Sequence, residues 1–256
     1  MTSPPEIVRK IEICAPRETV FRYFTDPARF AAWWGEGSTV DPRPGGRVAI
    51  RYPNGQRASG VFREIAPPGR VVFTFGNEGP NTPIPPGGST VIVTLEESAN
   101  GTLLTLRHTD LPNAEIVPHF LQGWRYQLSV FSRVVAAEQH AGAAAIADAW
   151  FEAWNAGDAA SRRERLEKCA VPGVAFADAY GVLAGYEDVE AQIAATKIFM
   201  PGKTVVRAGE PLLSHGHALV RWEVRDAAGA VEGRGTNAID FAPDGRILRA
   251  VGFWGP

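Results

Sequence analysis

The chain contains 256 residues, of which 45% are hydrophobic, and its 26 basic side chains nearly balance its 28 acidic ones. This length exceeds a common domain of about 100 to 150 residues, so two compact globular units are the first expectation. A formal net charge of -2 provides no global attraction for nucleic acid. Nucleic acid is therefore not expected as a partner. No run approaches about 18 consecutive apolar residues, so we expect a cytoplasmic protein that has no membrane partner.

The first unit is expected to begin with a strand and two helices. An apolar-rich run with β-branched residues at 6–15 predicts the strand, and apolar residues on one face of 16–26 predict the first helix. Asp26, which precedes Pro27, predicts the cap of a short second helix. Five strand-like runs separated by Gly and Pro turns then predict an antiparallel sheet, with a mobile loop at 77–88.

A long amphipathic helix is expected to close this unit, from about Ala114 to His140. Its apolar residues recur at steps of three and four, namely Val117, Phe120, Trp124, Leu128, Phe131 and Val135. One broad aromatic face is therefore buried. A sheet crossed by such a helix encloses either a packed core or a cavity.

The second unit follows a change of pattern at residues 137–145, where Gly142 can end one helix before Ala-rich sequence starts the next. We place the boundary there, which gives domains 1–140 and 141–256. The second domain is predicted to contain three helices, a short strand, and four final strands joined by SHGH, DAAG and PDGR turns. This order again predicts an α+β fold with an antiparallel sheet.

The first half resembles the AHSA-type family of the START-like (SRPBCC) superfamily. The resemblance rests on FTDPARFAAWWG, PRPGGRVAI and HFLQGWRYQLSVF, and it spans residues 1–140. It implies a helix-grip fold, in which the long C-terminal helix of the domain lies across a curved antiparallel sheet. It also implies a space between helix and sheet that holds an apolar ligand in many members.

The second half resembles the SnoaL-like branch of the nuclear transport factor 2-like superfamily. The resemblance rests on WFEAWNAGD, VAFADAYGVLAGYEDV and DGRILRAVGFWG within residues 141–256. It implies a cone-shaped α+β barrel with an internal pocket. The superfamily includes polyketide cyclases, steroid isomerases and dehydratases, together with members that have no catalytic role, so the fold alone does not decide the function.

Asp178 is the one carboxylate in the stretch VAFADAYGV at 174–182, where it follows four apolar or small residues. Because side chains alternate along a strand, Asp178 shares one face with Val174 and Phe176, and the alanines at 175, 177 and 179 share the other. If this face lines a pocket, a desolvated carboxylate there can act as a general base that removes a proton beside a carbonyl group. The alternative is a strand-end carboxylate that bonds the local backbone.

The resemblance also identifies candidate partners of Asp178, whose position matches the catalytic Asp of the superfamily's steroid isomerases. Their tyrosine donor corresponds here to Trp150, and their protonated acid corresponds to Asn237. Asn237 can still donate a hydrogen bond, but an indole is a weaker and differently shaped donor than a phenol. Ketosteroid isomerisation itself is therefore not expected.

His215 and His217 would lie on one face of a strand, which is a start for a zinc site. A third ligand is missing nearby, and catalytic zinc needs at least three protein ligands. We therefore expect no metal, and a turn with two exposed imidazoles is the alternative. The sequence contains no phosphate-binding loop, nucleotide-binding glycine pattern or serine-nucleophile motif, so no cofactor is expected.

Aromatic residues in both halves are candidates for lining pockets, with core packing as the alternative. The candidates in the first half are Trp33, Trp34, Tyr52, Phe62, Phe73, Phe75, His108, Phe120 and Trp124. Those in the second half are Trp150, Trp154, Phe176 and Tyr180. Adjacent residues on a helix diverge by about 100°, so we expect that Trp33 and Trp34 do not both face the core.

Together these patterns predict a two-domain protein that binds a small hydrophobic molecule in internal pockets. Asp178, with Asn237 as a donor, would add proton transfer of the isomerase, cyclase or dehydratase type. The alternative is a non-enzymatic ligand sensor, carrier or stress-related interaction module. In either case, the strand face that carries Arg221 and Glu223 is a candidate surface for a homodimer of the second domain.

Overall fold

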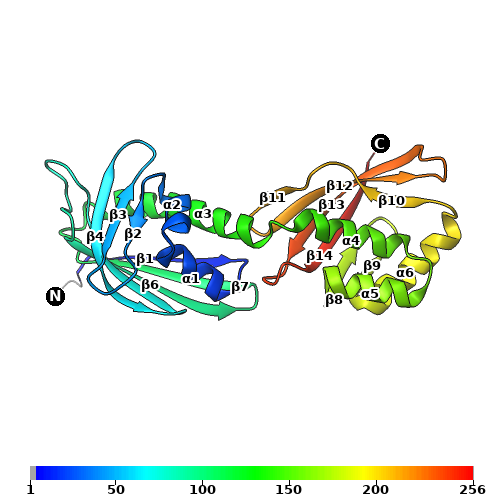
Figure 1. Ribbon diagram of the computed structural model, residues 1–256, viewed down its shortest axis with the longest axis horizontal. Coiled ribbons are helices and arrows are strands. Elements are labelled where there is room, and N and C mark those ends of the chain that lie inside the picture. Colours follow the sequence, from blue (N-terminus) through cyan, green and yellow to red (C-terminus); the bar gives the residue numbers. More distant parts are fainter. Residues whose placement is uncertain (1–3, 256) are drawn as a thin grey trace. The chain divides into compact units, whose positions relative to one another are not determined.

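The computed structural model describes residues 4–255, which form two compact units. The first unit ends at Ala136 and the second begins at Ala137, so the division lies within the long helix α3 (Val117–Gln139). Each unit contains a seven-stranded sheet with helices packed against it (Figure 1). The predicted α+β class is confirmed. Within residues 4–255, no helix is both long and apolar enough to cross a membrane.

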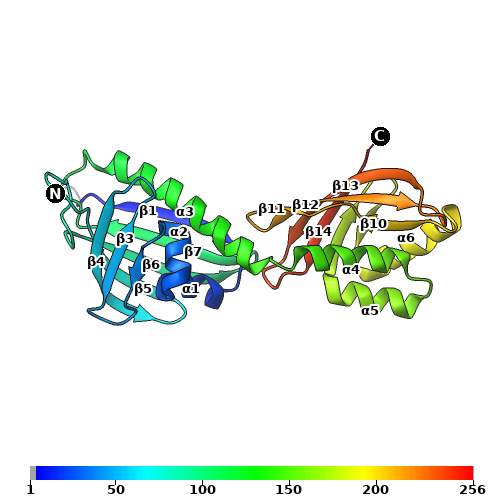
Figure 2. The same ribbon diagram turned by 45° about the horizontal axis from the view of Figure 1, so that its top comes forward.

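The first unit is an antiparallel sheet crossed by α3, as Figure 2 shows. The sheet has the order β1-β7-β6-β5-β4-β3-β2. Its elements are β1 (Ile7–Ile13), α1 (Arg17–Thr25), α2 (Pro27–Trp34), β2 (Thr39–Val40), β3 (Arg47–Arg51), β4 (Arg57–Ala66), β5 (Arg70–Phe75), β6 (Ser89–Ser98) and β7 (Gly101–Thr109). The apolar stripe of α3 is buried against this sheet, which is the helix-grip arrangement predicted from the sequence.

Local signals in the first unit mostly form the predicted elements. The Asp26 carboxylate accepts the backbone N–H of Arg29 at 2.9 Å and so caps α2 as expected. Six strands rather than five follow α2, because the two-residue strand β2 pairs with β3. The loop at 77–88 contains no regular strand, but it is anchored, since Ile84 is buried and its carbonyl accepts the N–H of Asn77 at 2.9 Å.

The expectation that only one of Trp33 and Trp34 faces the core is wrong, because each is only 2% exposed. The Trp33 ring packs edge-on against Phe131 of α3, with centroids 4.8 Å apart. The Trp34 ring packs edge-on against Trp124 of α3 at 5.8 Å. Trp124 and Phe131 are two helical turns apart on the same face of α3. One helix therefore covers both tryptophans, although they point in different directions from α2.

The second unit places three helices over one face of a mixed sheet. The sheet has the order β10-β12-β13-β14-β8-β9, and β11 also pairs with β12. Its elements are α4 (Ala143–Asn155), α5 (Ala159–Cys169), β8 (Ala170–Ala177), β9 (Val182–Ala184), α6 (Gly185–Phe199), β10 (Thr204–Arg207), β11 (Leu212–Ser214), β12 (His217–Arg225), β13 (Val231–Phe241) and β14 (Ile247–Gly255). The three helices and their order agree with the prediction.

Two strand predictions for the second unit need correction. The final segment contains five strands rather than four, since β10 and β11 both precede the SHGH turn. The sheet is also not wholly antiparallel, because β8 runs parallel to β14. These two strands are far apart in the sequence, so no hairpin forces an antiparallel pairing between them. Short strands such as β9 and β11 have too few residues to show an alternating pattern.

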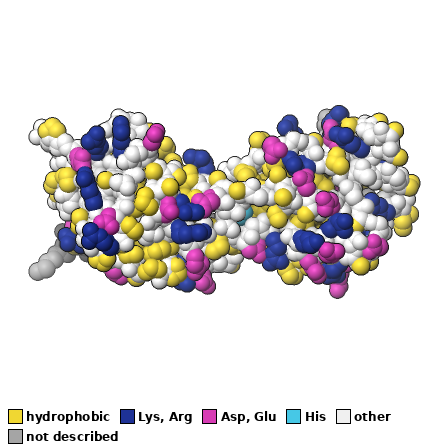
Figure 3. All heavy atoms as spheres, in the orientation of Figure 1, with side chains coloured by type: hydrophobic (Ala, Val, Ile, Leu, Met, Phe, Trp, Pro, Cys, Tyr) yellow, Lys and Arg dark blue, Asp and Glu magenta, His cyan; other side chains and the backbone are white. Residues whose placement is uncertain are grey.

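Charged side chains of both signs are interspersed on the surface of each unit that faces the viewer in Figure 3. The visible face thus has no large field of a single sign, as the nearly balanced composition predicts.

A buried polar network links the sheet of the first unit to α3. Trp124 Nε1 donates to His108 Nδ1 at 3.0 Å, and His108 Nε2 lies 2.7 Å from Ser89 Oγ. Because Nδ1 is the acceptor, the neutral imidazole carries its proton on Nε2 and donates to Ser89, whose hydroxyl donates to the Phe75 carbonyl. Burial lowers the pKa of His108 to about 4, against an opposing effect of Asp110.

We expect this histidine to make the first unit sensitive to acid. The pKa of His108 in the folded state lies below the ordinary value near 6.5. The contribution of neutral His108 to the unfolding free energy is therefore complete above about pH 6.5. It is lost as the pH falls towards 4, by on the order of 3 kcal/mol. Urea denaturation of the wild type and of His108→Gln at several pH values between 4 and 7 measures how the unfolding free energy depends on pH. Glutamine can both donate and accept but does not titrate, so its unfolding free energy should fall less steeply with acid. Equal slopes would contradict the prediction.

Candidate functional site

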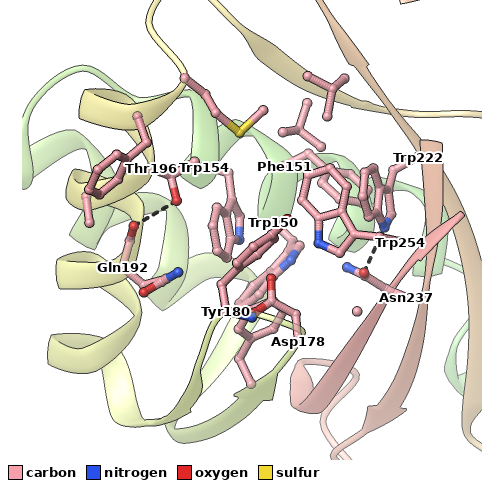
Figure 4. Close-up of a pocket in the computed structure, with 17 residues that line it drawn as sticks. Trp150, Phe151, Trp154, Asp178, Tyr180, Gln192, Thr196, Trp222, Asn237 and Trp254 are labelled. Atoms are coloured by element: carbon pink, nitrogen blue, oxygen red, sulfur yellow. Dashed lines mark hydrogen bonds between the residues drawn. The ribbon is translucent and has the colours of Figure 1, made fainter. Parts of the chain in front are cut away.

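A pocket of about 450 Å³ lies between the helices and the inner sheet face of the second unit (Figure 4). Cavities of this size accommodate small organic molecules. Helix α4 contributes Trp150, Phe151 and Trp154, and the end of α6 contributes Gln192, Ala195, Thr196, Phe199 and Met200. The strands and the turn after β8 contribute Phe176, Asp178, Tyr180, Val205, Trp222, Val224, Asn237, Gly252 and Trp254.

Two groups of aromatic rings form facing walls of this pocket. On one side, the centroids of Trp150 and Phe176 lie 5.8 Å apart, and those of Trp154 and Phe176 lie 5.2 Å apart. On the other side, Trp254 packs edge-on against Trp222 at 4.8 Å. Trp254 also meets Tyr180, which is 70% exposed, edge-on at 5.7 Å. The pocket therefore offers apolar ring surfaces on both sides of a flat ligand.

Asp178 lies just after β8, and its carboxylate has two different environments. Oδ1 accepts the backbone N–H groups of Tyr180 at 2.8 Å and of Gly181 at 3.0 Å. This is an Asx-type turn, the local backbone role considered as the alternative from the sequence. Oδ2 has no hydrogen-bond donor among residues 4–255, and the half-buried side chain lines the pocket. The turn therefore holds one oxygen and leaves the other to the cavity.

Asn237 lies opposite, and its orientation is determined by a tryptophan. Trp222 Nε1 donates to Asn237 Oδ1 at 2.9 Å, and both side chains are buried. An indole N–H can only donate, so the amide must turn its oxygen towards Trp222 and its nitrogen away. Figure 4 shows the Asn237 amide between Trp222 and Asp178. Within the described chain, Nδ2 has no acceptor.

Gly252 leaves the space between these two polar groups open. A Cβ atom at this position would lie 3.3 Å from Asn237 Oδ1 and 3.3 Å from the Cβ of Asp178. Both groups therefore approach the same point on the pocket floor. Among residues 4–255, Asp178 is the one lining residue with a carboxylate, and no lysine, arginine or histidine lines the pocket. The arrangement combines a carboxylate oxygen, an amide N–H donor and apolar walls.

The candidates from the second half of the sequence are brought together in this one pocket. Trp150, Trp154, Phe176, Asp178, Tyr180 and Asn237 all line it. Their chemical roles stay predictions. Asp178 points to the same side as Phe176, as the alternation along the strand predicts.

The candidates from the first half lie together in a hydrophobic cluster beneath α3. Eight of them are buried, namely Trp33, Trp34, Phe62, Phe73, Phe75, His108, Phe120 and Trp124, and Tyr52 packs against the cluster. Edge-on ring contacts connect many of them, for example Phe75 with His108 at 5.5 Å. Core packing thus accounts for their burial, and a ligand-lining role stays a prediction.

His215 and His217 do not share a strand face. His215 has a positive φ of 51° and lies in the turn between β11 and β12, whereas His217 begins β12. His217 Nδ1 lies 2.7 Å from Asp240 Oδ1, and Arg249 donates to the other oxygen of Asp240 at 2.6 Å. Partial burial opposes ionisation of Asp240, but the hydrogen bonds from Arg249 and His217 together lower its pKa. No cluster of three metal-binding side chains occurs in residues 4–255.

Sequence reasoning missed several residues of the pocket. The alternation of Trp222 with Val220 and Val224 on β12 indicates a buried face, but it does not distinguish core packing from a pocket lining. Gly252 and Trp254 alternate in the same way on β14 and could have been found by that signal. The lining residues at the end of α6 carry no comparable signal, because their contact with the pocket depends on how that helix packs.

Comparison with known proteins supports the resemblance of the first unit to the AHSA-type family. Residues 14–136 match the family of the Activator of Hsp90 ATPase homolog 1-like proteins. A comparison with the curated proteins finds no significant match.

Several solved structures are similar to about half of this chain. An AHSA1-like protein from Rhizobium etli is 34% identical, with a TM-score of 0.41, and the match covers 51% of this chain and 81% of that one. A provisional isomerase of the SnoaL-like family from Agrobacterium tumefaciens is 26% identical, with a TM-score of 0.42 and coverage of 46% and 99%. The Aha1 dimer from Colwellia psychrerythraea is 21% identical, with a TM-score of 0.42 and coverage of 48% and 90%.

We expect Gly252→Ala to obstruct the pocket floor without unfolding the protein. The added methyl group is tight against Asp178 and Asn237 but needs only a small shift, so the unfolding free energy should fall by about 1 kcal/mol. The affinity for tetralin, a small bicyclic aromatic hydrocarbon, should fall at least about threefold in equilibrium dialysis. Gly233→Ala is the control, because its methyl would make only ordinary contacts of 3.7 Å and Gly233 does not line the pocket. Equal affinities in the two variants would contradict this prediction.

Proposed function

We propose that the second unit binds a small apolar or aromatic carbonyl compound and catalyses proton transfer beside the carbonyl. Asp178 Oδ2 is the general base, and Asn237 Nδ2 donates a hydrogen bond to the carbonyl oxygen on which negative charge develops. This assigns an isomerase, cyclase or dehydratase type of reaction. The observation that carries the proposal is the convergence of these two groups above Gly252 in an aromatic pocket.

The environment of Asp178 supports this role. Its Oδ1 is fastened by two backbone N–H groups, so Oδ2 is held in one direction without a competing protein donor. Asp178 also makes no ion pair within residues 4–255. A carboxylate oxygen that lines the cavity and has neither a cationic partner nor a donor among residues 4–255 is available to accept a proton from a bound ligand.

We further propose that the first unit binds an apolar molecule beneath α3. Two buried polar atoms there support the proposal. Trp34 Nε1 is buried without an acceptor within the described chain, and burial raises the pKa of Tyr52. The rings of Trp34 and Tyr52 meet edge-on at 5.7 Å. A ligand with an acceptor atom near these rings would satisfy a donor that otherwise costs free energy.

A carrier or sensor without catalysis is the second candidate function. The observation that favours it is the turn that Asp178 makes with Tyr180 and Gly181, because this turn alone accounts for an aspartate at the position. In that case the aromatic walls and Asn237 bind the ligand, and Asp178 shapes the loop at the pocket mouth.

We propose that the second unit forms a homodimer through the outer face of its sheet. One apolar row crosses five paired strands on this face, from β12 to β9, and consists of Leu219, Ala238, Val251, Ala177 and Val182. Leu219 is 49% exposed and Val182 is 88% exposed. The adjacent row contains His217, Asp240 and Arg249, so it carries both signs of charge. A twofold axis can place such a row against its own copy, which makes a second chain the partner that fits.

The base assignment predicts the behaviour of Asp178→Asn. Asparagine keeps an oxygen that can accept from Tyr180 and Gly181, so the turn and the fold should persist while the base is lost. We expect the wild type to accelerate exchange of the hydrogens beside the carbonyl of 2-tetralone in D₂O, measured by NMR. The variant should lose about 100-fold or more of this acceleration.

Asp226→Asn provides the matched control for this experiment. Asp226 makes the same kind of turn, accepting from Ala228 N at 2.9 Å and Ala230 N at 2.8 Å, but it does not line the pocket. The Asp226→Asn variant should accelerate the exchange as much as the wild type does. Full exchange activity in Asp178→Asn, or no acceleration by the wild type, would overturn the catalytic assignment and leave the carrier as the function.

The dimer proposal predicts that Leu219→Lys dissociates the protein, because a charge within an apolar interface is costly to bury. Sedimentation velocity should show a dimeric wild type and a monomeric variant. Ile198→Lys is the control, since Ile198 is 76% exposed on α6 and does not belong to the sheet. A monomeric wild type, or a variant that remains dimeric, would disprove the interface.

A further inference from the structure

Trp222 presents an indole N–H to Asn237 rather than to a ligand. Trp222 is 5% exposed and Asn237 is 4% exposed, and the bond between them is 2.9 Å long. A free carboxamide could turn either its oxygen or its nitrogen towards the cavity. The indole removes this choice because it has a hydrogen to donate and no lone pair to accept one. The lining amide therefore always presents Nδ2 to the pocket.

The position of Trp222 is itself constrained by its neighbours. Trp254 packs edge-on against it at 4.8 Å with an interplanar angle of 82°. On the neighbouring strand, a Cβ at Gly235 would lie 2.2 Å from Cζ2 of Trp222, so the indole occupies the volume that any other residue at 235 would fill. Gly235 and Trp222 are directly paired across β12 and β13. The ring thus has little freedom to turn its N–H away from Asn237.

We infer that Trp222 is a positioning residue for a carbonyl-oxygen subsite above Gly252, in which Asn237 Nδ2 is preset to donate. The inference deepens the proposed function, on which it rests, by assigning how the pocket distinguishes an acceptor oxygen from a plain apolar group. An acceptor oxygen at this point gains a hydrogen bond from Nδ2. An apolar group at the same point leaves that N–H unsatisfied. Trp222 itself does not touch the oxygen.

The inference is tested by a matched pair of probes in the purified full chain. 2-Tetralone and tetralin share a bicyclic skeleton, and only the former has a carbonyl oxygen. Equilibrium dialysis gives the ratio of their dissociation constants for each protein. Relative to the wild type, Trp222→Phe should shift this ratio about three- to tenfold towards tetralin, the range expected for one neutral hydrogen bond. Phenylalanine keeps an aromatic ring but lacks the N–H that orients the amide.

Two further variants separate positioning from loss of structure. Asn237→Leu removes the donor and should shift the ratio by a similar factor, and Trp222→Phe should then cause no additional shift in the double variant. Phe176→Leu alters the opposite aromatic wall, where Phe176 packs against Trp150 and Trp154, so it should weaken the binding of both probes alike and keep the ratio. Circular dichroism verifies that each variant is folded.

The outcomes are distinct from those of the exchange experiment, because binding is measured rather than proton transfer. An unchanged ratio in Trp222→Phe overturns the inference. So does an additional shift in the double variant, or the absence of binding of both probes to the wild type. If no exchange depends on Asp178 but the expected binding ratios are observed, the catalytic proposal is removed and the carbonyl subsite stays in place.

Discussion

The alternation of side chains along the strands of the second unit determines both the pocket and the proposed dimer surface. Trp222, Asn237 and Gly252 lie on the inner face and line the pocket, whereas their sequence neighbours lie on the outer face. Because the alternation has a period of two, a slip of one residue in any strand pairing would exchange the two sets. The register between β12, β13 and β14 therefore controls the pocket and the candidate dimer surface together.

The two units use their aromatic residues differently. In the first unit, rings of α2 and α3 contact one another. The ring centroids of Trp33 and Phe131 lie 4.8 Å apart, and those of Trp34 and Trp124 lie 5.8 Å apart. In the second unit, the rings of α4 and those of β12 and β14 stand on opposite sides of a cavity. The same kind of residue thus forms a packed ring cluster where the rings meet and lines a cavity where they remain apart.

The sequence predicted the long helix, the α+β class of both halves and several pocket residues, because each depends on a local period. The 3.6-residue pattern of α3 and the alternation that ends at Asp178 are such signals. The burial of both Trp33 and Trp34 could not be predicted, since it depends on how α3 covers α2. The parallel pairing of β8 and β14 likewise depends on a long-range contact. The orientation of Asn237 required the position of Trp222, fifteen residues away in the chain.

The turn that fastens Asp178 has a stereochemical consequence for the proposed chemistry. One oxygen is tied to the backbone, so the carboxylate cannot swivel around a ligand held between the two aromatic walls. In the proposed reaction, a single oxygen atom would both accept and return the hydrogen. It reaches only one side of a planar intermediate, so the hydrogen would leave and re-enter through the same face. A product made in heavy water would accordingly carry its deuterium in one configuration.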